Sequence, residues 1–386
     1  MIVYVILLIF VPVLSIPVNF IALLRAPKGI NAVKHTCFFT IGLAFLAFHV
    51  VPNMEMDLYR YYLRMDQMLE LQTLDVIREE ISSFNTEFIS YYLMFIISKT
   101  GLYGLYPALS VAFTYSISLG IAIQVSRVRN YTVSETRLII LLLLTWLSSD
   151  AIVSGIRYNM AFSVLLLAVY YDYFLGKKNV LSYSLYFATL LIHSSFIVFV
   201  FFRILMPFLK RYKLLRYIVF LILATWSLYF GYLADMASNL SFYNDGYLTE
   251  KIEGYSFMHE GGRIGKYIVR YAKLLICVII SIVLIKKKET NENKKTIELF
   301  NTSNALLVVG SLNRLIYVSR FFQVFTSFVP FYIIEVIRSI SKGEKILFYL
   351  IIFMCSLFFI YDQQSILGFK LSNSFIHLLF TPIFFI

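Results

Sequence analysis

Long apolar runs separated by short polar turns dominate this chain of 386 residues. A helix needs about 17 or more apolar residues to cross the hydrocarbon core of a bilayer, and runs such as 2–24 and 105–125 meet that length. The pattern therefore predicts an all-α, polytopic transmembrane helical bundle with about 10 to 13 membrane segments. We expect residues 1–386 to form a single transmembrane domain.

The positions of the basic residues predict the orientation of these spans. The chain carries 34 Lys and Arg against 22 Asp and Glu, and its formal net charge is +12. The cations lie mainly in short turns between apolar runs, such as 25–34 and 127–137, and such turns face the cytoplasm. The positive charge thus indicates topology, and we expect no nucleic-acid partner. The three cysteines lie far apart in apolar runs, so neither a disulfide nor a metal cluster is expected.

Following these turns along the chain places two hydrophilic segments on the outer face, residues 52–87 and 235–266. The first has apolar residues at helical spacing, so an exposed helix is expected there. The apolar piece 88–98 is too short to span and is expected to be re-entrant or interfacial. Pro12 and Pro17 are expected to kink the first span.

Three further predictions follow from the same map. The run 180–209 lies between two basic turns that both face the cytoplasm, so we expect a hairpin of two short helices with its apex near His193. Residues 138–153 are expected to form one span. The apolar tail 374–386 is expected to dip back into the membrane.

This topology places several polar residues, which cost free energy to insert into a membrane, at the outer face. Arg157 starts an apolar helix and His193 lies at the hairpin apex, while Asp57, Tyr59 and Arg60 follow the second span. An ionisable side chain at membrane depth costs roughly 2.5–3.5 kcal/mol to insert, so it is a candidate functional residue. Two more candidates bracket a late outer connection: Arg314 and Arg320.

These residue types suit an anionic ligand that carries sugars. The guanidinium fork of arginine matches phosphate oxygens in two-point contacts and keeps its charge. Structural alternatives stay open: Arg157 could extend its head group to the membrane interface, His193 could satisfy backbone groups at a helix break, and Asp57 could pair with Arg60 in solvent. Asp150 and Asn159 could orient Arg157. No Walker loop, HExxH or GxSxG motif occurs, so ATP-driven and soluble-type hydrolytic mechanisms are unsupported.

Four segments resemble the EpsG/Wzy group of bacterial polysaccharide polymerases. They are MDLYRYY at 56–62, GIRYNMAFSVLLLAVYY at 155–171, LLIHSSFIVF at 190–199 and RFFQVFTSFVPFYI at 320–333. Their order matches that of the family, which has an acidic-tyrosine motif, an Ile-Arg helix start, a His-Ser hairpin and a late Arg-aromatic helix. Met56 and Tyr158 depart from the family pattern, in which Gly and Gln are commoner at these places.

The resemblance implies an integral glycosyltransferase of the Wzy type with a GT-C-like architecture, which needs neither metal nor cofactor. Such polymerases act at the outer face of the bacterial inner membrane on repeat units carried by undecaprenyl pyrophosphate. They transfer the growing chain to the non-reducing sugar of a new unit and release undecaprenyl pyrophosphate. The implied partners are this lipid-linked glycan, the bilayer, a chain-length regulator and a flippase.

The resemblance also suggests roles for the candidate residues. Arg157 with Arg314 or Arg320 would hold the pyrophosphate, and His193 or Asp57 would be the base for the acceptor hydroxyl. Two other residues would contact the substrate: Tyr59 and Arg60. A lipid-linked oligosaccharide flippase, a glycan ligase and a membrane acyltransferase stay open as alternatives, although the chain lacks the internal repeat that is typical of transporters.

Overall fold

A computed structural model of the chain describes residues 2–54, 56–72, 87–147, 149–177, 179–212, 214, 218–219, 275–276, 278–280, 282–283, 327–362, 370–372 and 374–383. Most of these residues are helical, as the hydrophobic pattern predicts. The chain divides into two compact units, one of residues 1–200 with 359–386 and one of residues 201–358. The predicted outer loop 235–266 lies outside the described residues, as do Arg314 and Arg320.

The first unit begins with two short helices where one kinked span was predicted. α1 (Ile2–Phe10) ends before Pro12, and α2 (Pro12–Arg25) begins with it. Proline has no N–H to donate, so it is tolerated in the first turn of a helix but interrupts one that precedes it. The predicted distortion at Pro12 is therefore a full break, whereas Pro17 lies within α2 without ending it.

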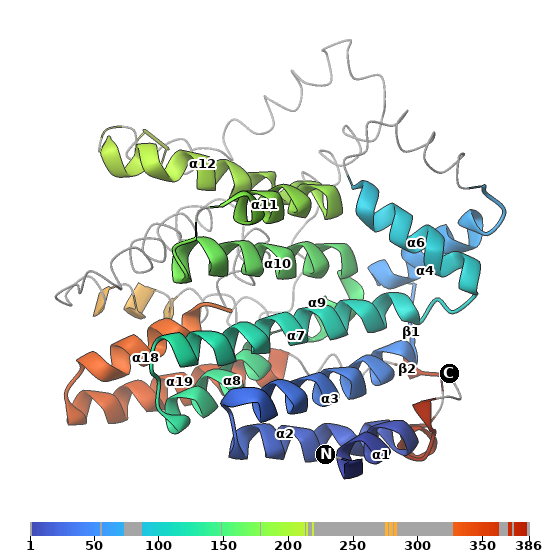
Figure 1. The fold of residues 1–386 in the computed structure, drawn as a ribbon, viewed down its shortest axis with the longest axis horizontal. Coiled ribbons are helices and arrows are strands. Elements are labelled where there is room, and N and C mark those ends of the chain that lie inside the picture. Colours follow the sequence, from blue (N-terminus) through green and yellow to red (C-terminus); the bar gives the residue numbers. More distant parts are fainter. Residues whose placement is uncertain are drawn as a thin grey trace. The chain divides into compact units, whose positions relative to one another are not determined.

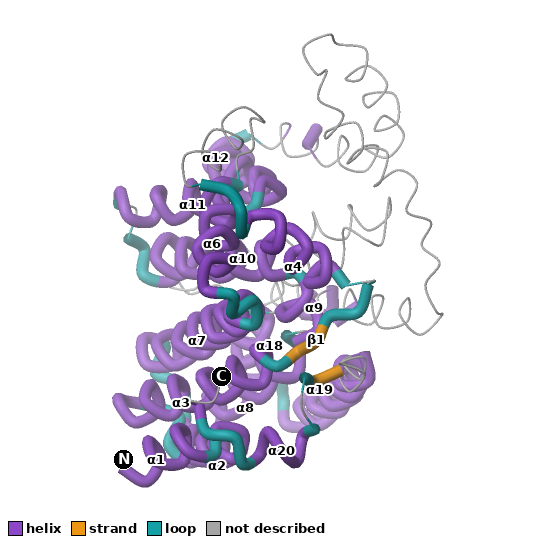
Figure 2. The backbone as a smooth tube through the Cα atoms, turned by 90° about the vertical axis from the view of Figure 1, so that its right-hand side faces the viewer, coloured by secondary structure: helices purple, strands orange, loops and turns teal. Residues whose placement is uncertain are grey.

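Five helices of this unit lie side by side in a row, as both views show (Figures 1 and 2). α2 packs on α3 (Gly29–Phe48), α3 on α7 (Leu105–Val128), α7 on α10 (Ile156–Val169) and α10 on α11 (Val180–Ile192). Small residues and hydroxyls permit this close packing. The Ser163 hydroxyl, for example, donates to Thr114 Oγ1 over 3.2 Å between α10 and α7. Among the described helices, α3 and α7 are long and apolar enough to cross a membrane.

The predicted span 138–153 is instead two helices, α8 (Val133–Trp146) and α9 (Ser149–Ser154). α8 begins five residues earlier than predicted because Thr132 and Glu135 form a capping box. The Thr132 hydroxyl accepts the backbone N–H of Glu135 at 3.2 Å, and Glu135 Oε2 accepts that of Thr132 at 2.6 Å. α10, for its part, is continued by a π-helical turn, Tyr170–Phe174.

Two basic turns meet at one end of this unit. Lys28 Nζ donates to the carbonyl of Tyr131, and Arg137 Nε donates to the carbonyl of Leu24 over 2.6 Å. These cations satisfy carbonyls at helix ends, where they also interact favourably with the helix dipole. The turns 25–34 and 127–137 were predicted to share one membrane face, and these contacts confirm that they lie together.

The other end of α3 leads to an amphipathic helix, α4 (Asp57–Met68), in the predicted outer loop 52–87. α4 buries Leu58 and Met65 and packs on α6 (Phe88–Thr100) and α9. Two polar contacts secure the end of α4 and the residues after it: Tyr103 donates to Asp66 Oδ1 at 2.7 Å, and Lys99 Nζ to the carbonyl of Leu71 at 2.8 Å. Residues 73–86 of this loop lie outside the described residues.

The C-terminal segment returns to the first unit. β2 (Lys370–Leu371) pairs antiparallel with β1 (Val50–Val51), just after α3. The short α20 (Phe375–Leu379) places Leu378 in a cluster with Val13 and Phe45. The tail predicted to re-enter the membrane therefore docks on α2 and α3.

A helix break at His193 separates α11 from α12 (Ile197–Arg211), as predicted for the run 180–209. α12 leads into the second unit, which contains α18 (Val329–Ser339) and most of α19 (Lys342–Asp362). Both helices consist mainly of apolar residues. α18 is buried along residues 329–337.

Gly104 permits the tight approach of α7 to the end of α3. A Cβ at this position would overlap the carbonyl oxygen of Phe48 and lie 2.9 Å from its ring Cδ2. We expect Gly104→Val to destabilise the protein by about 1–3 kcal/mol, because overpacking forces the backbones apart. The thermal midpoint of the detergent-solubilised protein measures this change. Gly120→Ala on α7 is the matched control, since nothing lies within 4 Å of its Cβ, and equal midpoints for both variants would contradict the prediction.

Candidate active site

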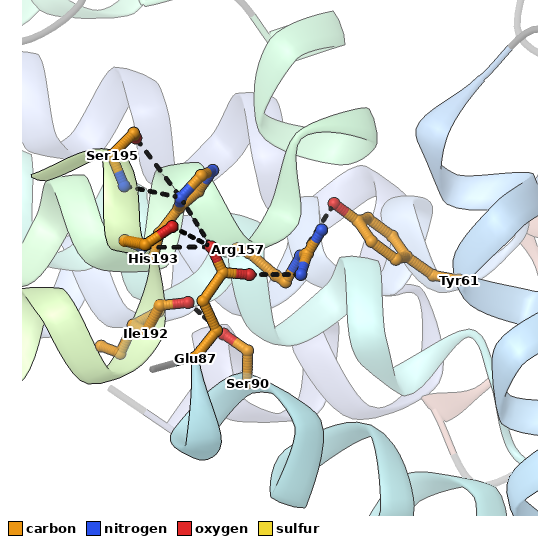
Figure 3. Close-up of polar contacts among 8 residues, drawn as sticks. Tyr61, Glu87, Ser90, Arg157, Ile192, His193 and Ser195 are labelled. Carbon is orange, nitrogen blue, oxygen red and sulfur yellow. Dashed lines mark hydrogen bonds and ion pairs between the residues drawn. The ribbon is translucent and has the colours of Figure 1, made fainter. Parts of the chain in front are cut away.

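Polar side chains from four elements meet at the end of the first unit that is remote from the two basic turns. α10 starts there and α11 ends there, α6 begins there, and α4 packs alongside. Figure 3 shows the centre of this cluster, in which the carboxylate of Glu87 lies between Arg157 and His193. The sequence predicted that Arg157 and His193 share one face, and the structure places both on the same carboxylate.

Arg157 lies in the first turn of α10 and is held on several sides. Its Nη1 forms an ion pair with Glu87 Oε2, and its Nε donates to the hydroxyl of Tyr61 over 3.3 Å. The guanidinium also lies over two aromatic rings, 5.2 Å from the centroid of Tyr61 and 5.7 Å from that of Tyr91. Cation–π contacts of this kind gain strength where water is excluded, and the side chain is only 19 % exposed. The head group is therefore fixed in one orientation.

Glu87 is the residue that sequence reasoning missed. It immediately precedes α6, and its side chain is only 1 % exposed. Its Oε1 accepts the backbone N–H of Ser194 at 3.1 Å and the Ser194 hydroxyl at 2.8 Å, and it lies 3.2 Å from His193 Nδ1. A buried carboxylate is stable only when it is paired and hydrogen-bonded, and Glu87 is both.

The surroundings of Glu87 keep it ionised. Burial alone would raise the pKa of its carboxyl, but the hydrogen bond from His193 and the charge of Arg157 more than offset that effect, so the pKa lies well below its ordinary value of 4.5. A carboxylate whose pKa is lower in the folded chain than in the unfolded one stabilises the fold at pH values above its ordinary, unfolded-state pKa. This contribution is lost as the pH falls toward the lower, folded-state pKa.

His193 ends α11 in an extended conformation, with φ −153° and ψ 115°. Its Nδ1 lies 3.3 Å from both the backbone nitrogen and the hydroxyl of Ser195, in the 3₁₀ turn Ser194–Phe196. The rings of His193 and Tyr158 are nearly perpendicular, at a centroid distance of 5.9 Å. The contact with Ser195 is the helix-break role that the sequence left open, and the contact with Glu87 is additional to it.

Hydrogen bonds from two buried side chains, Ser90 and Asn159, fix the backbones that carry these side chains. The Ser90 hydroxyl donates to the carbonyl of Ile192 over 2.6 Å, which ties the first turn of α6 to the end of α11 (Figure 3). The fully buried Asn159 donates to the carbonyls of Ala151, at 2.6 Å, and Gly155, at 2.8 Å. Asn159 thereby stabilises the break between α9 and α10, beside which Arg157 lies.

The predicted residues on α4 lie at the solvent side of this cluster. Asp57 Oδ1 and Arg60 Nη1 are 3.4 Å apart, with side chains 49 % and 71 % exposed, so they form a solvated pair within one helix. Tyr59 lies on the same helix. α4 reaches the cluster through Tyr61, whose hydroxyl accepts from Arg157. Within the described part of the chain, no group of three or more His, Cys, Asp or Glu side chains could hold a metal ion.

Comparison with known proteins supports the resemblance seen in the sequence. The sequence model of the EpsG family matches residues 36–380. The chain belongs to the EpsG family. This is a family of polysaccharide polymerase-like membrane proteins, and the chain is therefore a membrane protein of the polysaccharide polymerase type. Neither the curated proteins nor the solved structures contain a match to the chain.

The region matched by the EpsG family contains every residue of this cluster, from Tyr61 to Ser195. The arginine and the histidine that share this carboxylate are residue types with distinct chemical properties. The arginine can stabilise an anion, and the histidine can take up or release a proton near neutral pH. The cluster therefore brings together side chains of the types that can bind an anion and exchange a proton.

One local signal in the sequence could have revealed Glu87. It is the last residue of the predicted outer loop and directly precedes the apolar run 88–98. A lone acid at the start of an apolar helix can be a capping residue in solvent or a buried partner of a cation. Only the three-dimensional arrangement distinguishes these alternatives, because Arg157 and His193 lie 70 and about 106 residues further along the chain.

Proposed function

We propose that this EpsG family member is a polysaccharide polymerase of the Wzy type. It joins oligosaccharide repeat units carried on undecaprenyl pyrophosphate by transferring the growing chain to the non-reducing sugar of a new unit. The observation that carries the proposal is the buried Arg157–Glu87–His193 cluster, in which a desolvated guanidinium and an imidazole share one carboxylate. Undecaprenyl pyrophosphate is the leaving group.

The surroundings of Arg157 suit a pyrophosphate. The N-terminal ends of α6 and α10 meet here, and helix N-termini carry partial positive charge and orphan N–H groups that attract phosphate. Nη1 and Nε of Arg157 are engaged, whereas Nη2 has no hydrogen-bond partner among the described residues and is available for an anion. Preorganised cationic donors stabilise the charge that develops as the pyrophosphate departs. We retain Arg314 and Arg320, outside the described residues, as further phosphate contacts on the basis of the resemblance.

The acceptor side of the reaction needs a base, and His193 fits this role better than Asp57. His193 lies beside Arg157 on the same carboxylate, so a hydroxyl near the departing pyrophosphate is within its reach. Asp57 instead pairs with Arg60 on the exposed side of α4. Tyr59 and Arg60, on α4, are proposed to contact the sugars or the lipid-linked phosphate.

We place this reaction at the outer face of the bacterial inner membrane, in a multi-pass protein with two outer hydrophilic loops and a GT-C-like arrangement of helices. Two observations support this orientation. The basic turns 25–34 and 127–137 meet at one end of the first unit, and basic turns face the cytoplasm. The candidate site lies at the other end, where α3 leads into α4. A flippase would supply the lipid-linked units there, and a chain-length regulator would limit their number.

Deletion of the gene in its host tests the proposal. We expect a gel of the surface glycan to change from a ladder to a single repeat unit, and only the wild-type gene, not Arg157→Ala, to restore the ladder. Complete loss of surface glycan with lipid-linked units trapped inside the cell would identify a flippase. Loss of acyl groups at unchanged chain length would identify an acyltransferase, and full-length polymer left on its lipid carrier would identify a ligase.

A further inference from the structure

The two carboxylate oxygens of Glu87 contact different residues of the proposed active site, Arg157 and His193. Oε2 holds the guanidinium of Arg157, while Oε1 faces His193 Nδ1 at 3.2 Å and accepts two hydrogen bonds from Ser194 (Figure 3). Donors from α10 and from the break after α11 thus converge on a single buried acid. A side chain that only balanced the charge of Arg157 would not need the second set of contacts.

We propose that Glu87 is the positioning residue of this site: it fixes the guanidinium of Arg157 and selects the tautomer of His193 that carries its proton on Nδ1. Glu87 would touch neither substrate. This inference rests on the proposed function, because it assigns to Glu87 the task of preparing one residue for the donor and another for the acceptor.

The tautomer follows from the chemistry of the neighbours of Nδ1. An ionised carboxylate can only accept hydrogen bonds, so Nδ1 must carry a hydrogen to bond to Glu87. The backbone N–H of Ser195, 3.3 Å away, can only donate, so it favours the opposite tautomer. The carboxylate prevails because hydrogen bonds to a charged group are the stronger ones, and because a buried charge is costly to leave unsatisfied. In the neutral ring the proton-accepting lone pair is then on Nε2.

The reaction that this arrangement serves is balanced without another reactant. The acceptor hydroxyl gives its proton to Nε2 of His193 as its oxygen bonds to the anomeric carbon of the donor. The bond from that carbon to the pyrophosphate oxygen breaks, and its electron pair leaves with undecaprenyl pyrophosphate. Glu87 keeps its negative charge throughout and stabilises the imidazolium that forms, as the buried acid of a catalytic triad does.

The backbone contacts show that Glu87 and His193 are held in a fixed relation. Glu87 immediately precedes α6, and Ser90, in the first turn of that helix, donates to the carbonyl of Ile192, the residue before His193. Positioning groups are effective when their own rotamers are locked by packing and hydrogen bonds, and Glu87 at 1 % exposure meets that condition.

The test uses the purified full-length protein with a lipid-linked repeat unit, and compares wild type with Glu87→Gln and Glu87→Asp. Glutamine keeps the shape but loses the charge, and its amide N–H₂ would face other donors. We expect the kcat of chain extension to fall about 100-fold in Glu87→Gln, and the KM for the donor to rise. Glu87→Asp keeps the charge but is too short to reach both partners, so we expect it to recover part of that loss. Glu135→Gln, an acid at the start of α8 near the two basic turns, is the matched control and should retain wild-type kcat.

The pH profile separates positioning from a structural role. In the part of the chain that the structure describes, His193 contacts Glu87 before α6 and Tyr158 on α10, and Arg157 holds the other oxygen of Glu87. The negative charge of Glu87 stabilises the imidazolium of His193. Removal of that charge in Glu87→Gln should therefore move the acidic limb of the plot of kcat against pH to lower pH by about one unit. A purely structural role would reduce the yield of folded protein and leave the profile in place.

Each outcome has a distinct meaning. If Glu87→Gln shows wild-type kcat and pH profile, the positioning role is wrong while the proposed polymerase stands. If Glu87→Gln does not give folded protein, Glu87→Asp decides, because full kcat in that variant would overturn the inference. A wild-type protein that does not extend the lipid-linked unit at all contradicts the proposed function itself.

Discussion

Arg157→Lys is expected to lower the rate of chain extension about 100-fold or more, because the loss of one preorganised donor to a developing anion has an effect of that size. Lysine keeps the charge but lacks the planar fork. It cannot bind Glu87 and the Tyr61 hydroxyl at once and still offer a donor to pyrophosphate, which is the role proposed for the guanidinium. It would also lose the flat contacts with the rings of Tyr61 and Tyr91. The measurement is the length distribution of polymer made per mole of folded enzyme.

Arg127→Lys provides the matched control for this substitution. Arg127 is an exposed residue at the end of α7, beside the two basic turns, and we expect its replacement to leave the polymer unchanged. If Arg157→Lys makes near-normal polymer at equal expression, Arg157 contributes only its charge or a place at the membrane interface. The alternative that the sequence left open, a guanidinium extended to that interface, would then be correct.

His193→Gln is the second substitution with a large expected effect, a fall of about 10²–10⁴-fold in kcat, which is the usual contribution of a positioned general base. Glutamine can still donate a hydrogen bond to Glu87, so the helix break and Arg157 should stay in place. It cannot accept a proton. The loss should therefore appear in kcat, with little change in the KM for the lipid-linked donor.

His377→Gln, on the exposed face of α20, is the control for this experiment and should keep wild-type kcat. A rise in KM together with a fall in kcat and a lower thermal midpoint would show that His193 chiefly secures the break between α11 and α12. Wild-type kcat in His193→Gln would transfer the role of base to another group, with Asp57 as the next candidate.

The sequence predicted the helical architecture and two of the three central residues for clear physical reasons. The charge of the turns alone required a break in the run 180–209, and the structure has it at His193. Arg157 stood out because a cation at the start of an apolar helix needs a partner. Both predictions rest on the free-energy cost of placing charged residues in a bilayer. This cost does not depend on how the other helices pack.

The local sequence pattern could not predict which side chains pair across the fold or where short interruptions divide the helices. Glu87 looks like the last residue of a polar loop until α6 is packed against the end of α11. The break between α9 and α10 is stabilised by Asn159, a residue of α10 whose side chain donates to the carbonyls of Ala151 and Gly155. Side chains that are far apart in sequence and satisfy each other leave no periodic signal, so their pairing becomes visible only in the folded chain.

The most direct test of the central claim is a reaction with purified protein in a defined lipid mixture, supplied only with the undecaprenyl-pyrophosphate-linked repeat unit. If the Arg157–Glu87–His193 cluster is the active site of a polymerase, wild-type protein makes a ladder of lipid-linked chains and releases one undecaprenyl pyrophosphate for each new linkage. A lipid-linked unit that stays a single repeat, with no release of undecaprenyl pyrophosphate, would contradict the account.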